Sequence, residues 1–159
     1  KLFGSLQSGI IAGDKKMIQS IKESPLFRTY RCSPLTLFEL QETTSKYVSK
    51  KEIEIPLWKM ISMKYENLEN RIKSVCENLE IKHEVVHDYS VMGGGTLPNK
   101  SIASPVIQIS ELENKDLMSK LMRNDIPIIP RTNKNNIIID LRSTSEKNDI
   151  HIKDFFTNL

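Results

Sequence analysis

The stretch HEVVH at residues 83–87 has the residue types and the spacing of a zinc site. On a helix, His83 and His87 would lie on one face and bind zinc, with Glu84 as the general base of a hydrolase. The surrounding residues are β-branched, which favours a strand. On a strand the two histidines would lie about 13 Å apart, too far to share one metal ion. The zinc hydrolase therefore stays open only as an unfavoured alternative.

Two arginines three residues apart, Arg28 and Arg31, could face a single anion. The guanidinium group forms forked hydrogen bonds that suit phosphate-like groups, so this pair is a candidate anion site. The alternative is that both arginines are solvated charges near a bend of the chain. Taken alone, the residue types favour the solvated alternative.

Two further features could serve a ligand or a cofactor. The run Gly93–Gly95 would let a backbone approach a ligand closely, but it matches no phosphate-binding motif, and a loop between strands is favoured. A lysine can carry a cofactor as a Schiff base. Nothing in the composition marks Lys1, the first residue, for that role.

The bulk composition is that of a globular protein, with 159 residues, 38% hydrophobic, 27% charged and a net charge of +3. No run of basic residues argues for a nucleic-acid surface. Cys32 and Cys76 form no disulfide or metal-binding pattern, which is typical of a reducing compartment. No apolar run approaches the roughly 20 residues that span a bilayer. We therefore expect a cytoplasmic protein with no membrane segment.

The first half of the chain predicts helices that would position the arginines. Residues 7–13 read as a short strand, and Asp14 can cap a helix that Pro25 ends. The pair Ser33 and Pro34 is a typical helix start. From residue 56 to about residue 79, apolar residues recur every three or four positions, which predicts one long amphipathic helix.

The second half predicts a small mixed sheet covered by helices. Strands are expected at residues 82–90, 104–110, 126–131 and 135–142, and helices at 113–125 and 149–159. The turn Asn133–Asn136 would join the last two strands as a hairpin. Long helices followed by a small sheet indicate an α+β or α/β fold.

Five segments occur in a characteristic order and register. They are KLFGSLQSGIIAG (1–13), IKESPLFRTYRCSPLTLFELQETT (21–44), IPLWKMIS (55–62), SVMGGGTLP (90–98) and IPIIPRTNKNNIIIDLRS (126–143). Together they resemble the carboxyl-terminal part of the bacterial selenocysteine synthases, the L-seryl-tRNA(Sec) selenium transferase family. The resemblance extends over essentially the whole chain.

The resemblance implies an enzyme that depends on pyridoxal 5′-phosphate (PLP) and has the fold of type I, the α/β fold of the aspartate aminotransferases. Such an enzyme converts seryl-tRNA(Sec) to selenocysteinyl-tRNA(Sec) with selenophosphate, through a dehydroalanyl-tRNA intermediate. The resemblance places the catalytic, PLP-binding Schiff-base lysine on Lys1 and the selenophosphate-binding arginines on Arg28 and Arg31. It assigns no role to Gly93–Gly95. It also implies a homo-oligomer built from dimers.

The resemblance further divides the chain into three parts. Residues 1–50 would be the last elements of the PLP-binding large domain, 51–80 a long connecting helix, and 81–159 a small α+β domain. The partners of the PLP ring and phosphate and the tRNA-binding domain would lie upstream of Lys1. We therefore expect a fragment that is inactive alone and exposes apolar surface on residues 1–50.

Some departures and alternatives stay open. Ser5 and Leu6 stand where many family members have glycine and proline, which leaves the local turn uncertain. The chain could instead belong to a PLP-dependent lyase or transferase of the same superfamily that acts on a small substrate. It could also be a remnant, or the product of a split gene, that serves as a binding module.

Overall fold

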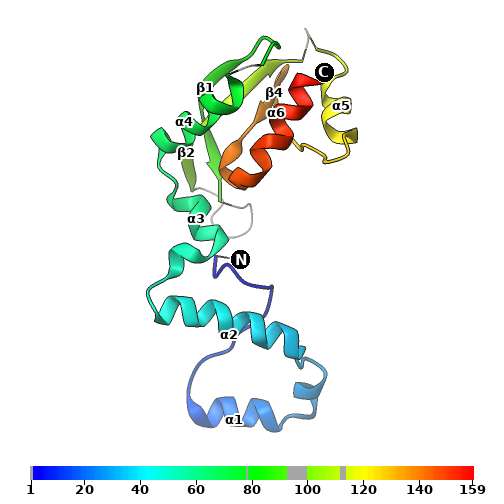
Figure 1. The fold of residues 1–159 in the computed structure, drawn as a ribbon. Helices are drawn as coiled ribbons and strands as arrows, with labels where there is room; N and C mark the ends of the chain where they lie inside the picture. The colour runs from blue at the N-terminus through cyan, green and yellow to red at the C-terminus, as the bar shows by residue number, and fades with distance from the viewer. Residues whose placement is uncertain (1, 78, 93–99, 112–113) are drawn as a thin grey trace. The chain divides into compact units, whose positions relative to one another are not determined.

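The computed structural model describes residues 2–77, 79–92, 100–111 and 114–159. Lys1 and the run Gly93–Gly95, both candidates from the sequence, lie outside the described residues. The chain divides into two compact units, Lys1–Lys59 and Met60–Leu159, whose elements are labelled in Figure 1. Among the described residues, no helix is both long enough and apolar enough to span a bilayer.

The first unit is helical, and its helix starts confirm the predicted caps. In α1 (Lys15–Glu23) the Asp14 carboxylate accepts from the backbone N–H of Lys16 at 2.9 Å. In α2 (Pro34–Val48) the Ser33 hydroxyl accepts from the N–H of Thr36 at 3.2 Å. The unit also contains two short 3-10 helices, η1 (Pro25–Arg28) and η2 (Glu52–Glu54).

The strand predicted over residues 7–13 is wrong, since these residues are neither strand nor helix. Ile10 and Ile11 are 68% and 70% exposed. A strand requires a partner backbone to pair with. The described part of the first unit contains no strand, so the apolar pattern alone cannot form one here.

The second unit holds a four-stranded sheet with the order β1-β2-β4-β3. The strands are β1 (Glu84–Val91), β2 (Ser101–Ser110), β3 (Arg131–Asn133) and β4 (Asn136–Ile139). The predicted hairpin is confirmed, since β3 pairs with β4. The sheet is antiparallel throughout instead of mixed. The prolines Pro127 and Pro130, which lack a backbone N–H, explain why the strand predicted from residue 126 begins only at Arg131.

The single long helix predicted from Pro56 is also wrong. The structure has two helices, α3 (Pro56–Ser62) and α4 (Tyr65–Cys76), with an extended backbone at Lys64 between them. Arg142 donates hydrogen bonds from Nη1 to the carbonyls of Met60 at 3.2 Å and Met63 at 2.8 Å. The last carbonyls of a helix have no partner within the helix, and Arg142 supplies donors for carbonyls at the end of α3.

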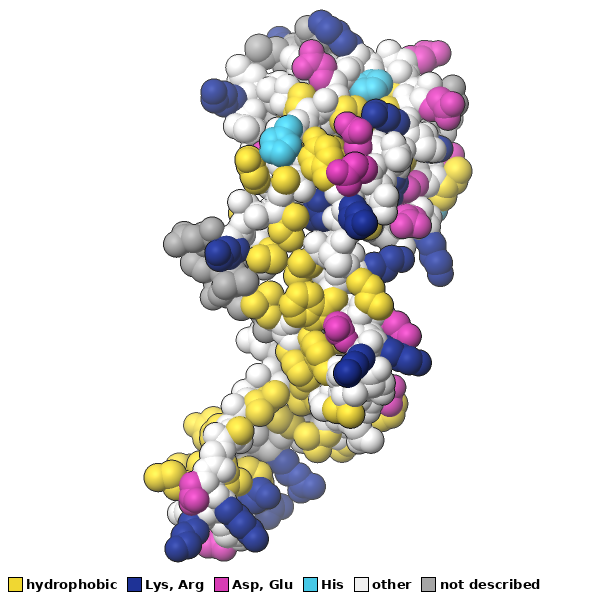
Figure 2. Space-filling model, turned by 90° about the vertical axis from the view of Figure 1, so that its left-hand side faces the viewer, with side chains coloured by type: hydrophobic (Ala, Val, Ile, Leu, Met, Phe, Trp, Pro, Cys, Tyr) yellow, Lys and Arg dark blue, Asp and Glu magenta, His cyan; other side chains and the backbone are white. Residues whose placement is uncertain are grey.

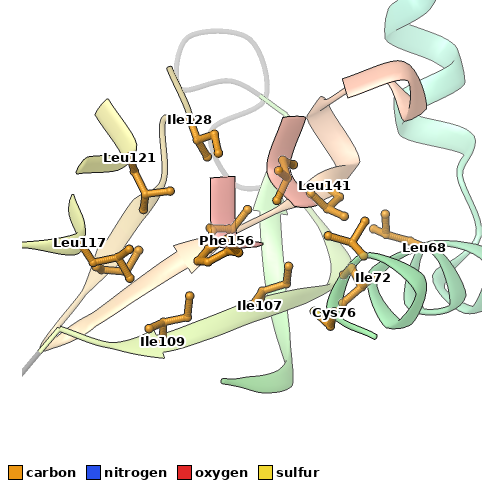
Figure 3. Close-up of a cluster of buried hydrophobic side chains, with 14 residues drawn as sticks. Leu68, Ile72, Cys76, Ile107, Ile109, Leu117, Leu121, Ile128, Leu141 and Phe156 are labelled. Carbon is orange, nitrogen blue, oxygen red and sulfur yellow. The ribbon is translucent and has the colours of Figure 1, made fainter. Parts of the chain in front are cut away.

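The core of the second unit lies on one face of the sheet. Helices α4, α5 (Leu117–Arg123) and α6 (Asp149–Thr157) contribute side chains that meet those of β2 and β4. Figure 3 shows this cluster, which includes Leu68, Ile72, Ile107, Ile109, Leu117, Leu121, Leu141 and Phe156. Two more short 3-10 helices, η3 (Leu141–Ser143) and η4 (Glu146–Asn148), lead into α6. The fold is therefore mixed α/β with a small antiparallel sheet.

Candidate functional site

Arg28 and Arg31 lie in and just after η1 in the first unit. Pro25 occupies the first turn of η1, and the Ser24 hydroxyl accepts from the N–H of Leu26 at 3.4 Å, which sets the path of the chain toward both arginines. Both side chains are exposed. Neither has a hydrogen bond or an ion pair with another described residue. Two cations without carboxylate partners are available to an anionic ligand.

A cavity of about 700 Å³ lies beside η1 within the first unit. Arg31 lines it and Arg28 does not. Lys22, from the last turn of α1, is the second cation of the wall. Among the described residues, no acidic residue lines the cavity, and most of its wall is apolar. The cavity therefore favours an anion that approaches Arg31 and Lys22.

The sequence did not single out Lys22. Its signal is present, since Lys22 lies in the same segment as the arginines, but only the turn at Ser24 and Pro25 brings α1 back beside Arg31. Figure 2 shows many hydrophobic side chains exposed on one face of the molecule, this unit included. The exposed apolar side chains include Ile10, Ile11, Met17, Leu26, Leu35, Leu37, Phe38 and Val48. The predicted apolar surface on residues 1–50 is confirmed.

The segment that follows Lys1 is anchored to the rest of the first unit. The rings of Phe3 and Tyr47 stack with centroids 5.0 Å apart, and the Tyr47 hydroxyl donates to the Phe3 carbonyl at 2.9 Å. Gly4 has a φ of 76°, and a Cβ there would lie 2.5 Å from Cγ2 of Ile55, so only glycine fits. Ser5 is not among the residues with positive φ, so the turn forms without a glycine at that position.

The HEVVH segment does not have the helical geometry that a zinc hydrolase requires. Glu84 to His87 lie in β1, where a spacing of four residues corresponds to about 13 Å. His87 packs between aromatic rings, with centroids 5.6 Å from Tyr65 and 5.0 Å from Tyr89. His83 uses Nδ1 in a 2.8 Å hydrogen bond with the carbonyl of Ile81. Both histidines thus have structural partners, and the zinc interpretation is wrong.

A polar network crosses the sheet of the second unit. Asp140 accepts from the hydroxyls of Ser90 and Ser104 and from the backbone N–H of Arg142. Arg142 is only 4% exposed and donates to Ser104 and to the carbonyl of Ala103, besides those of Met60 and Met63. Burial lowers the pKa of Arg142, and the charge of Asp140 opposes that effect. The dense pairing marks a structural role.

The two cysteines are poor candidates for chemistry. Cys76 is buried in the core, and desolvation raises the pKa of its thiol to about 11. At neutral pH the thiol therefore stays protonated, and a protonated thiol is a weak nucleophile. Cys32 is half-buried in the wall of the cavity beside Arg31.

Comparisons with known proteins agree on one family. The model of the L-seryl-tRNA selenium transferase family matches residues 1–145. The L-seryl-tRNA(Sec) selenium transferase of Aliarcobacter butzleri is 38% identical over 166 aligned residues, which cover 100% of this chain and 36% of the relative. The transferases of Campylobacter lari and Caldanaerobacter subterraneus are each 35% identical to this chain over 92% of its length. The aligned regions make up 32% and 33% of these two relatives, respectively.

The chain thus spans about a third of the length of the curated relatives it matches. The match includes the segment after Lys1, both arginines and the antiparallel sheet. The chain belongs to the L-seryl-tRNA selenium transferase family.

Proposed function

We propose that the chain is the carboxyl-terminal part of a PLP-dependent enzyme that converts seryl-tRNA(Sec) to selenocysteinyl-tRNA(Sec) with selenophosphate. The observation that carries the proposal is the exposed pair Arg28 and Arg31, which has no carboxylate partner among the described residues. Arg31 of this pair lines a cavity that has no acidic residue among the described residues of its wall. In a member of this family, such a pair fits an anionic selenium donor. The transferase would be a cytoplasmic oligomer of dimers.

The residues that follow Lys1 fit a cofactor-bearing lysine. A lysine that holds PLP must keep one position, and the stacked Phe3 and the tightly packed Gly4 fix the adjoining backbone. Lys1 would hold the cofactor covalently. When bound, PLP supplies an electron sink that makes removal of the serine α-proton and hydroxyl feasible.

The chain's own residues would then divide the work. The Lys1 amine would take the proton from the serine α-carbon and serve as the general base. Arg31 and Arg28 would bind selenophosphate through charge-assisted hydrogen bonds and orient its selenium toward the serine β-carbon. Lys22 would add positive charge at the same wall of the cavity. The apolar wall would limit the access of water.

We propose in addition that the full-length enzyme has the fold-type I architecture and that this chain contributes parts of its two domains. Residues 1–50 would form the last elements of the large domain, and residues 81–159 would form the small domain. Residues 51–80 would connect the two domains. Exposed side chains such as Ile10, Ile11 and Phe38 would be covered by the rest of the large domain, because apolar patches of this kind mark contact surfaces. The chain alone would lack the rest of the site and would be inactive.

Replacing Arg31 by alanine in the full-length enzyme should raise the KM for selenophosphate about 10- to 100-fold, because a hydrogen bond from a charged donor is lost. The KM of Arg31→Lys should lie between those of the parent enzyme and Arg31→Ala, since lysine keeps the positive charge and loses the forked hydrogen bonds of the guanidinium group. Steady-state kinetics with varied selenophosphate would measure the effect. Arg123→Ala, an exposed arginine of α5, is the matched control and should change nothing. An unchanged KM in both Arg31 variants would remove selenophosphate from this site.

A further inference from the structure

The hydroxyl of Tyr47 joins two segments that are distant in sequence. It accepts a hydrogen bond from Nε1 of Trp58 at 2.5 Å and donates one to the carbonyl of Phe3 at 2.9 Å. Because the indole N–H can only donate, it occupies a lone pair of the hydroxyl and leaves the hydroxyl hydrogen for Phe3. The direction of both bonds is thereby fixed.

Other contacts hold the same segment. The Phe3 ring stacks on the Tyr47 ring, with an angle of 25° between their planes. On the next residue, Gly4 packs so closely on Ile55 that a methyl group would not fit. The hydroxyl bond, the ring stack and the close packing involve different atoms, so they restrain the position and the rotation of this backbone together.

We propose that Tyr47, oriented by Trp58, is a positioning residue for Lys1. Only Leu2 separates Phe3 from Lys1, so two peptide links, each about 3.8 Å between Cα atoms, join the anchored carbonyl to the lysine. A displacement of about 1 Å in a reacting group can cost about 100-fold in rate. The inference rests on the proposed function, in which Lys1 bears the cofactor.

The first test does not depend on the cofactor. In the 159-residue chain, Tyr47→Phe removes the hydroxyl and keeps the ring that stacks on Phe3. Amide hydrogen exchange in the peptide that covers residues 2–6 should become about fivefold faster, in line with one lost hydrogen bond. Tyr89→Phe, which alters a 54% exposed tyrosine of β1, is the matched control and should leave this exchange unchanged.

The second test uses the full-length enzyme with PLP. Tyr47→Phe should lower kcat about tenfold with little change in the KM for selenophosphate. It should also shift the pH at which the visible band of the lysine-bound cofactor titrates. Trp58→Phe should produce smaller changes in the same direction, because the Tyr47 hydroxyl remains but loses its orienting donor.

Unchanged exchange, kcat and band titration in Tyr47→Phe would overturn the inference. If Tyr47→Phe failed to fold, the same measurements would be made on Trp58→Phe. Exchange, kcat and band titration equal to those of the parent enzyme would then overturn the inference. If the parent enzyme showed no cofactor band while the exchange still responded, the proposed function would fail and the anchoring role of Tyr47 would stand.

Discussion

Under the proposed function, selenium transfer by the full-length enzyme should fall by about 10⁴-fold when Lys1 is replaced by alanine, because the variant would lose both the cofactor's covalent attachment and the general base. Transfer of selenium from selenophosphate to seryl-tRNA(Sec) measures this directly. Lys15→Ala, at the exposed first position of α1, is the matched control and should keep full activity. The 159-residue chain assayed alone should show no transfer.

An added primary amine provides a sharper form of the same experiment. A small amine can replace a missing lysine as the base, so it should restore part of the activity of Lys1→Ala and none to the isolated chain. Activity of Lys1→Ala equal to that of Lys15→Ala would show that Lys1 has no role in the chemistry. Activity of the isolated chain would contradict the proposal that the remaining parts of the site lie elsewhere.

Replacing Arg142 by alanine should destabilise the second unit by about 3–5 kcal/mol, the usual cost of removing one partner from a buried charged network. The substitution leaves the carbonyls of Met60, Met63 and Ala103 without the guanidinium donor. Buried acceptors without partners are costly, because water does not replace the lost donors. Urea unfolding followed by far-UV circular dichroism, with hydrogen exchange of the β2 amides, measures the loss in this unit.

Arg131 supplies the matched control for Arg142. Its side chain is 47% exposed and pairs with Asp88 at 3.1 Å and with Asp140 at 3.4 Å. Exposed pairs of this kind contribute about 0–1 kcal/mol, so Arg131→Ala should be nearly neutral. Similar small losses in the two variants would mean that the buried network contributes little to the stability of the fold.

The elements that the sequence predicts correctly are those decided by local chemistry. Asp14 and Ser33 cap their helices through bonds to residues two and three positions away. The hairpin between β3 and β4 depends on a short polar turn at Lys134, where φ is 55°. In each case a few neighbouring residues suffice to set the backbone.

The secondary-structure predictions are wrong where the local structure depends on residues that are distant in the sequence. The apolar period continues through the break between α3 and α4 and gives no sign of it. The carbonyls of Met60 and Met63 at this break are bound by Arg142, which lies 82 and 79 residues away in the sequence. Residues 7–13 have the apolar pattern of a strand, but strand formation depends on a partner that no local pattern supplies.

In the candidate site, too, some features are visible in the local sequence and others depend on the fold. The type and spacing of Arg28 and Arg31 are visible in the sequence, while their lack of carboxylate partners among the described residues emerges only from the fold. Lys22 is visible in the sequence only as a basic residue near the arginines, and Tyr47 carries no signal. Their roles depend on the turn at Pro25 and on contacts that cross 44 residues of chain.

The proposed role of Lys1 is tested most directly by locating the cofactor on the polypeptide. The full-length enzyme would be reduced with borohydride, which fixes PLP to its lysine, and then digested and mapped by mass spectrometry. We expect a single modified lysine, Lys1, in the peptide that continues into LFGSLQSGIIAG. A modification at any other lysine, or none at all, would contradict the proposed role of Lys1.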